Sequence, residues 1–439
     1  MFNVKTLQTV ILILIGSLLV PAQSIEAQAT DDSTRINELE RQIQAITQDL
    51  EELTLGTEVV NPAERGAFGL APAAGKVYTI NQGVSIGGYG EVLYQGYAGK
   101  KESGAASGKT AKLDAYRGII YVGYKFNDRV LFNSEIEIEH GSTGLKGSAS
   151  LEFAYLDYKL TDNFGLRAGL LLVPVGITNE IHEPPVWLGT IRPRSENKII
   201  PTTWRESGFG FFGETDALSY RFYLVNSLDG IGGGSAGSSG FSSSGLRGGR
   251  QKGSKAIAEN FSAVGRIDYT ATPGLMIGTS LYTGDQGHNS DFNGREVSIG
   301  TTIWEGHIKY QGRGFDVQAL TALASVNNAD KLNEMKGLSG SGSVGEQMSG
   351  WYLQLGYDLL FSSASEHQLL PYIRYEAVNT QVEVPSGYSS SGSKDFNVTS
   401  IGMAWKPIGN AVLKTDYEIH SNASSSGVNQ FNVALGWLF

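Results

Sequence analysis

The side chains best suited to attracting and sorting ions lie in a long stretch between two expected strands, residues 177–205. Its ionisable side chains are Glu180, His182, Glu183, Arg192, Arg194, Glu196, Lys198 and Arg205, with Trp187 and Trp204 as aromatic anchors. Four bases against three acids give it a charge of +1 (4 − 3, histidine neutral). Charges at a narrow point select ions by electrostatics at close range. Alternatively, these charges pair with one another and hold the stretch in place.

A second segment with binding chemistry reads GLRGGRQKGSK, from Gly245 to Lys255. It places four bases among glycines: Arg247, Arg250, Lys252 and Lys255. With Asp229, residues 226–258 carry a charge of +3 (4 − 1). Exposed backbone amides and mobile cations suit phosphate or carboxylate groups. The alternative is a solvated loop without a ligand. The GK[ST] spacing of a nucleotide-hydrolase phosphate loop is missing.

A third set of charges follows the two-residue alternation of strands. Glu135, Glu137 and Glu139 fall on one face of a single expected strand, and counting back through the turn at Asn127 places Arg117 near Glu139. The same face of other strands carries Arg167, Arg221, Arg266 and Arg374, with the acids Asp268 and Glu376. Opposite charges on neighbouring strands stabilise a sheet. We therefore expect cross-strand ion pairs on this face.

Catalysis is not expected from this sequence. Acid–base or nucleophilic chemistry needs a positioned histidine beside a nucleophile or an acid. The histidines are His140, His182, His288, His307, His367 and His420, and none has a partner at a motif spacing. We predict no enzyme, no cofactor and no metal.

The elements that must position these charges are strands of about ten residues, beginning near Val84. The last ten residues show the pattern best: Phe431, Val433, Leu435, Trp437 and Phe439 share one face, while Asn432, Ala434 and Gly436 share the other. An apolar, aromatic face opposite a small, polar face suits a strand between lipid and a water-filled lumen. A terminal Phe on such a strand is typical of the closing strand of an outer-membrane barrel.

The breaks between strands alternate in length. Short turns such as 127–129, 161–163, 272–274, 311–314 and 409–410 alternate with long breaks near 98–112, 177–205, 226–258, 284–294, 327–346 and 379–394. This is the asymmetry of an outer-membrane barrel, which has tight periplasmic turns and long external loops. We predict an all-β, antiparallel transmembrane barrel of about 16 strands over residues 84–439. Side chains cannot fill an interior of that size, so a channel is expected.

Three segments precede the barrel. Residues 1–29 read as a secretory signal peptide, with Lys5, an apolar core and the site Ala27-Gln28-Ala29. Residues 30–55 carry a heptad seam, which predicts a periplasmic coiled-coil helix compatible with a trimer; an amphipathic helix against the barrel is the alternative. Residues 56–83, with Pro62 and Pro72, read as a linker.

Composition agrees with an exported β protein. Its 439 residues include 57 Gly and no Cys, which excludes a disulfide framework. The formal charge is −10, of which residues 30–56 hold −5 (seven acids, two bases). Half of the acidity therefore lies outside the strand region, and the overall charge is a poor guide to the lumen.

Taken with this pattern, three stretches resemble the phosphate-selective porin O and P superfamily of Gram-negative porins. They are the strand SIGGYGE from Ser85, LRAG from Leu166, and IPTTWRESG from Ile200, which follows the long third loop. The resemblance covers roughly residues 30–439. It implies a homotrimeric barrel whose third external loop folds inward and narrows the pore. The interspersed wall carboxylates depart from that family's anion-binding ladder.

The predicted function is an outer-membrane porin for passive diffusion of small hydrophilic solutes or ions, with anions such as phosphate as candidates. Expected partners are outer-membrane lipid, lipopolysaccharide, which the basic loop could bind, and the barrel assembly machinery through Phe439; nucleic acid is not expected. The alternative is a structural protein that tethers the envelope through its N-terminal coil. A plugged TonB-dependent transporter is not indicated, because no plug domain precedes the first strand.

Overall fold

The computed structural model describes residues 35, 37–44, 66–144, 147–234, 238–363 and 365–439. The chain divides into two units, residues 1–57 and 58–439, and each is considered by itself. In the first unit the described residues are helical and exposed, and Arg41 Nε lies 3.2 Å from Glu38 Oε2. The predicted signal peptide, and the rest of the predicted coiled coil, lie outside the described residues, so the pairing of helices stays a prediction.

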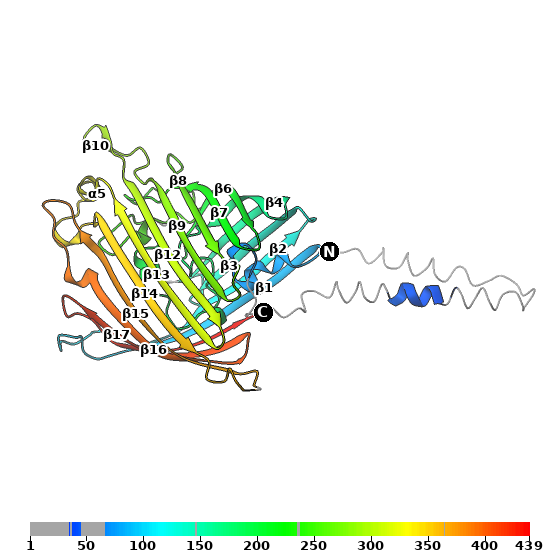
Figure 1. Cartoon of the computed structure of the whole chain (residues 1–439). Helices are drawn as coiled ribbons and strands as arrows, with labels where there is room; N and C mark the ends of the chain where they lie inside the picture. The colour runs from blue at the N-terminus through cyan, green and yellow to red at the C-terminus, as the bar shows by residue number, and fades with distance from the viewer. Residues whose placement is uncertain (1–34, 36, 45–65, 145–146, 235–237, 364) are drawn as a thin grey trace, which may run out of the picture. The chain divides into compact units, whose positions relative to one another are not determined.

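Sixteen antiparallel strands of the described second unit close into one barrel, in which β1 pairs with β18 (Figure 1). They are β1 Gly83–Tyr97, β2 Lys112–Lys125, β3 Val130–Glu139, β4 Ser148–Thr161, β5 Phe164–Leu172, β6 Arg205–Glu214, β7 Leu218–Asn226, β8 Phe261–Tyr269, β9 Leu275–Asp285, β12 Gly300–Gly312, β13 Phe315–Val326, β14 Gln347–Tyr357, β15 Gln368–Glu383, β16 Asp395–Ile408, β17 Ala411–Asn422 and β18 Gln430–Leu438. The all-β antiparallel barrel and its predicted strand number are confirmed.

Shorter elements lie in the connections and before β1. The strands β10 Asp291–Phe292 and β11 Arg295–Glu296 form a separate hairpin that projects from one end of the barrel (Figure 1). The helical turns are η1 Ala67–Gly69, α3 Pro72–Gly75, η2 Lys76–Tyr78, η3 Pro184–Val186, α4 Ser195–Lys198, η4 Arg247–Gly249, α5 Ala329–Met335, η5 Gly340–Gly342 and η6 Gly392–Lys394. Within the described ranges, no helix has the length and apolar character that a bilayer crossing requires.

The two faces of the sheet differ in chemistry as the alternation predicts. On β18, Phe431, Leu435 and Trp437 are exposed on the outside, whereas Asn432 is buried on the inside. Large apolar side chains are exposed around the barrel in the same way, including Ile120, Leu166, Trp304, Trp351, Leu353 and Ile401. A closed sheet satisfies its backbone hydrogen bonds internally, so its outer face can be apolar.

One residue departs from the simple alternation. Strict alternation from Arg117 would place Tyr116 on the outer face, yet Tyr116 lines a cavity inside the barrel beside Arg117. The register between β1 and β2 shifts between Glu91 and Leu93, opposite this point. A β-bulge re-aims the side chains next to it. Consecutive residues of β2 can therefore both reach the interior.

Most connections at one end of the barrel are shorter than those at the other end, with 358–367 as the exception. One end, here the short-turn end, carries 126–129, 162–163, 215–217, 270–274, 313–314, 358–367 and 409–410. The other, here the long-loop end, carries 98–111, 140–147, 173–204, 227–260, 286–299, 327–346, 384–394 and 423–429. The sequence pattern missed the connections 140–147, 215–217, 358–367 and 423–429.

The predicted linker over 56–83 does not hold for its described part. Residues 66–79, here the lumenal segment, form three short helical turns inside the barrel. Phe68 packs edge-on against Tyr78 and Phe212, with ring centroids 4.9 Å apart in both pairs. Val77 fills the space that Gly123 of β2 leaves on the inner wall. A segment rich in Ala and Gly fits a narrow interior as well as it suits a linker. Composition alone therefore cannot distinguish the two.

Candidate functional site in the barrel lumen

Residues 173–204, here the crossing loop, run through the interior of the barrel rather than over its rim. Glu180 Oε2 lies 2.9 Å from Arg221 Nη2 on β7. On another part of the wall, the Thr190 amide donates to Asp416 Oδ2 on β17 at 2.8 Å. The same loop therefore contacts widely separated strands. The inward course implied by the family resemblance is the course that this loop takes.

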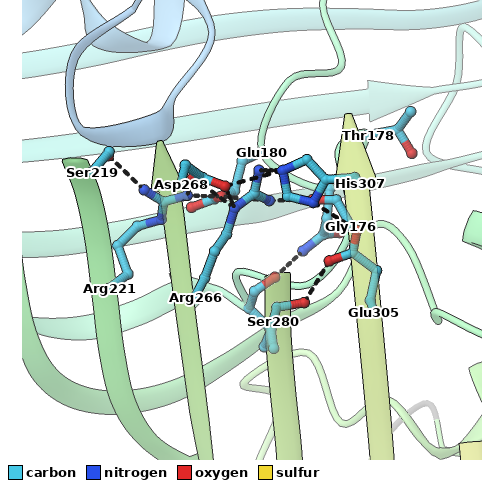
Figure 2. A network of polar contacts seen from close by, with 12 residues as sticks. Gly176, Thr178, Glu180, Ser219, Arg221, Arg266, Asp268, Ser280, Glu305 and His307 are labelled. Atoms are coloured by element: carbon cyan, nitrogen blue, oxygen red, sulfur yellow. Dashed lines mark hydrogen bonds and ion pairs between the residues drawn. The ribbon is translucent and has the colours of Figure 1, made fainter. Parts of the chain in front are cut away.

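A buried cluster of charges fastens the first half of the crossing loop to β7, β8 and β12 (Figure 2). Glu180 lies between Arg221 and Arg266, at 2.9 and 3.3 Å. Both guanidinium groups also contact Asp268 Oδ2 at 2.9 Å. Arg266 further donates to the carbonyl of Gly176. Because paired and hydrogen-bonded charges tolerate burial whereas a lone charge does not, the loss of Glu180 would leave two cations poorly compensated.

His307 and Glu305 of β12 extend this cluster to Ser280 of β9 (Figure 2). His307 Nε2 lies 3.0 Å from Asp268 Oδ1, and its Nδ1 lies 2.7 Å from Glu305 Oε1. The Ser280 hydroxyl donates to Glu305 Oε2 at 2.7 Å. Ser280 thus contacts the carboxylate and not the imidazole, so these residues do not form a nucleophile–base pair. Their arrangement braces the wall beneath the crossing loop.

The second half of the crossing loop is fastened to β15 and β17. Arg194 Nη2 lies 2.7 Å from Glu418 Oε2, and the Arg194 amide donates to Glu376. Arg374, also paired with Glu376 at 3.3 Å, donates to the carbonyl of Ile191 at 2.9 Å. Burial works against the charge of Arg194, but the nearby carboxylates of Glu418 and Glu376 raise its pKa above the ordinary value. This guanidinium is therefore a fixed anchor.

A buried carboxylate joins the middle of the loop to β14. Glu196 accepts from the amide of Thr178 at 2.6 Å, from its hydroxyl at 3.0 Å and from Tyr352 Oη at 2.8 Å. Burial raises the pKa of Glu196, while the Thr178 amide counters that rise. Glu196 thus links the early and late parts of the crossing loop to each other and to the barrel wall.

Glu183 joins the crossing loop to the lumenal segment. Its carboxylate accepts from the amides of Ala73 and Ala74, at 3.2 and 2.9 Å, and is fully buried. Burial raises the pKa of Glu183 to about 7, against the lowering effect of the two amides. The neighbouring His182 lies 3.3 Å from Glu135 of β3. The interior is thus filled by two segments that contact each other.

The remaining wall residues expected from alternation face the interior, and those with cationic side chains are paired. Arg167 forms a two-contact pair with Asp157 at 2.8 and 2.9 Å and donates to Tyr78 of the lumenal segment. Arg117 is in register with Glu139 but forms its ion pair with Glu91, at 3.3 Å. Glu135 and Glu137 are buried on the inner face, and Glu139 lines a cavity there.

The basic loop, residues 227–260, covers the crossing loop at the long-loop end. Arg250 Nη1 donates to the carbonyls of Thr202 and Thr203 at 3.0 and 2.6 Å. Across the barrel mouth, Lys394 Nζ donates to Ser244 Oγ at 2.6 Å. Lys255 is exposed. The loop was expected to be free and mobile at its bases, but Arg250 is instead committed to backbone carbonyls.

Cations without a carboxylate partner gather where these two loops meet. Within the described residues, no ion pair joins Arg192, Lys198, Arg247, Arg250 or Lys252 to an acid. Burial and the charge of Arg192 lower the pKa of Arg247 to about 10; burial and the charge of Arg247 lower that of Arg250 to about 9. Arg205 differs, because it pairs with Glu152 at 2.5 Å. A site with uncompensated positive charge favours an anion.

Two of the cavities in the described interior lie toward opposite ends of the barrel. The cavity at the short-turn end measures about 310 Å³ and is lined by Leu70, Val186 and Lys309, among others. The cavity at the long-loop end measures about 210 Å³, and its polar lining includes Arg117, Arg192, Arg194 and Arg247. The sequence pattern had predicted each of these arginines as a separate site residue, without placing them in one cavity. It missed Asp416, Glu418 and Glu305, which alternation also places inward.

No family model matches the chain. An uncharacterized protein of Aquifex aeolicus (strain VF5) is 36% identical over 396 residues, which cover 88% of this chain and 87% of that protein. The chain belongs to the family of that protein. Because the match covers most of both chains, it groups whole proteins rather than a shared fragment.

Among solved structures, the complex of Salmonella typhi OmpF with daunomycin matches with a TM-score of 0.52 and 11% identity, over 82% of this chain and 98% of that one. An anion-selective porin from Comamonas acidovorans matches with a TM-score of 0.49 and 11% identity, over 82% and 100% of the two chains. At such identity the likeness to OmpF concerns the fold: this chain has a porin-type barrel.

Proposed function

We propose that this protein is an outer-membrane channel through which small hydrophilic solutes pass by diffusion, with a preference for anions. The observation that carries the proposal is a closed barrel that is apolar outside and lined by charged side chains inside. Such a surface is stable only with lipid around it, and such an interior attracts water and ions. The porin-type fold supports the same reading.

The preference for anions follows from which charges are paired. The wall arginines Arg117, Arg167, Arg221, Arg266 and Arg374 each lie within ion-pair distance of a carboxylate and so contribute little net field. The unpaired cations of the two loops stand at the long-loop end. At the short-turn end, Lys309, Lys406 and Lys414 have no ion-pair partner in the described chain. Unpaired cations at both ends favour anion entry; phosphate is one candidate among several.

The proposal extends to location and assembly. The long-loop end faces outward and the short-turn end the periplasm, as outer-membrane barrels require. The same proposal includes export by a cleaved signal peptide and assembly through the closing strand that ends at Phe439. It also includes contact with lipid and lipopolysaccharide, and a homotrimer. A helix in the first unit is compatible with trimer formation, which cross-linking in native membranes would test.

Ion substitution in planar bilayers tests the function. Under a KCl gradient the wild-type channel should give a reversal potential with the same sign as the equilibrium potential of chloride. Removing two unpaired cations, in R192Q/R247Q, should lower the chloride-to-potassium permeability ratio severalfold, because the local positive field is weaker. K255Q is the matched control: it removes one cation from the same loop at an exposed position and should change the ratio little. The proposal would be contradicted by an absence of conductance, or by a reversal potential with the sign of the potassium equilibrium potential.

A further inference from the structure

The two cavities of the lumen are separated by a short partition of the crossing loop, residues 184–188. Val186 lines the cavity at the short-turn end, whereas its neighbour Trp187 lines the cavity at the long-loop end. Two consecutive residues of the chain therefore line different cavities. A solute that crosses the barrel by way of the two cavities must pass this partition.

The backbone of the partition is held on both sides. Pro184 packs so closely on β18 that a Cβ at Gly436 would lie 2.5 Å from Pro184 Cβ. Leu188 is buried in a cluster with Leu370, Tyr372, Ala404 and Val412. Two residues later, Thr190 bonds to Asp416 through its amide and its hydroxyl. The partition therefore cannot open easily as a rigid body, and a side chain has to move instead.

The side chain placed to move is Trp187, which lies on the amine of Lys414. Lys414 Nζ is 3.8 Å from the centroid of the Trp187 ring, a close cation–π contact. Trp187 is 5% exposed and Lys414 1% exposed. The described chain offers no hydrogen-bond acceptor to Trp187 Nε1 or to Lys414 Nζ. Buried donors without acceptors cost free energy, and a ligand that supplies an acceptor recovers it.

The acids near this pair make their ion pairs and hydrogen bonds with other groups. Glu91 lies 3.3 Å from Arg117 through its Oε2, and its Oε1 has no hydrogen-bond partner among the described residues. Asp416 accepts from Thr190, from Tyr372 at 2.7 Å and from Asn432 at 2.8 Å. Neither forms an ion pair with Lys414 in the described structure. The vacant acceptor position at the ammonium thus suits an anion.

We propose that Trp187 and Lys414 form an anion-responsive gate between the two cavities. In the closed arrangement the indole face covers the ammonium. An arriving inorganic anion takes the place of the ring on Lys414, and the indole swings aside, which opens the partition. The cation–π contact is exchanged for an ion pair, which is the stronger interaction where water is scarce. The proposal rests on the channel function, since it assigns the residues that limit passage.

Single-channel recordings of wild type, W187A and K414Q in KCl and in potassium phosphate test the gate. W187A should conduct severalfold more than wild type, because the covering ring is absent. K414Q should keep the ring but lose the ammonium, so its anion-to-cation permeability ratio should fall. The control is K255Q, which removes an exposed lysine from the basic loop; it should change single-channel conductance far less than W187A.

Failure of the gate and failure of the channel are distinguishable. If wild type conducts and W187A conducts equally, the gate is overturned and the channel stands. If none of the variants conducts, the channel itself fails. Tryptophan fluorescence then tests the gate without a conductance measurement. The difference in emission between wild type and W187F should change on phosphate titration, and K414Q should abolish that change. An emission difference unaffected by phosphate would overturn the gate.

Discussion

At the scale of residues, the interior is dominated by carboxylates that hold segments in place rather than meet solutes. Glu180, Glu183 and Glu196 each bind a different partner: two guanidinium groups, two backbone amides, and a threonine with a tyrosine. The sequence left open whether the charges of this loop act on ions or hold the loop. For the three acids, the contacts favour holding. Among the described residues of the two loops, the cations without an ion-pair partner include Arg192, Arg247 and Arg250.

Glu183 gives a prediction at this scale, because burial raises its pKa from 4.5 to about 7. Between these values the folded state binds more protons than the unfolded state, so its stability falls as pH rises from 4.5 to 7. At about 1.4 kcal/mol per pKa unit the loss is on the order of 3 kcal/mol at most. E183Q, which remains neutral, should lack this fall. Urea unfolding in lipid vesicles across that range measures the difference between the two proteins; parallel curves would contradict the assignment.

At the scale of elements, the lumenal segment and the inner wall fit each other. Gly123 of β2 makes room for Val77, and Asn133 of β3 donates to the carbonyl of Ala74 at 2.8 Å. Tyr78 donates to Asp157 at 2.6 Å, within the pair that Asp157 forms with Arg167. These contacts make the segment part of the barrel interior, where it occupies the side near β2–β7. Leu70 of the segment also lines the cavity at the short-turn end, so the segment narrows the lumen there.

A glycine pair on β2 tests this role of the lumenal segment. A Cβ at Gly123 would lie 2.6 Å from Val77, whereas a Cβ at Gly118, on the outer face of the same strand, would meet nothing within 4 Å. Overpacking of this kind costs about 1–3 kcal/mol. G123V should therefore displace the segment and raise single-channel conductance, while G118V should conduct as wild type does. Equal conductance of the two variants would mean that the segment does not restrict the pore.

At the scale of the whole molecule, the barrel separates its tryptophans into two populations. Trp304, Trp351, Trp405 and Trp437 are 40–45% exposed on the outer wall, whereas Trp187 and Trp204 are buried inside. Aromatic side chains on the outer face of a barrel meet lipid near the two interfaces. The distribution is thus a property of the closed sheet and does not depend on any one loop.

Brominated lipids test this arrangement in reconstituted protein. They should quench most of the wild-type emission, because four of the six tryptophans face outward. In W187F/W204F, which keeps only the outer tryptophans, the quenched fraction should rise further. If brominated lipids quenched the wild type and this variant to the same small extent, the outer face would not contact the bilayer.

The sequence by itself determined the barrel, since alternation is a local property: Phe431, Leu435 and Trp437 must share a face wherever β18 lies. The same parity put Arg117, Glu135 and Arg374 inside, and turn chemistry at Asn127 set the register that opposes Arg117 to Glu139. The predicted number of about 16 strands came from counting such segments, although four connections between them were missed. These inferences need only neighbours along the chain or across one hairpin.

Tertiary structure alone decided what fills the barrel. The pairing of Glu183 with Ala73 and Ala74 joins residues about 110 positions apart, and Thr190 meets Asp416 at a separation of 226. Irregular segments such as 66–79 and 173–204 have no period that reveals their partners, so their course depends on the shape and charge of a wall that must first close. The same holds for Trp187 and Lys414, whose contact exists only because the loop crosses the lumen.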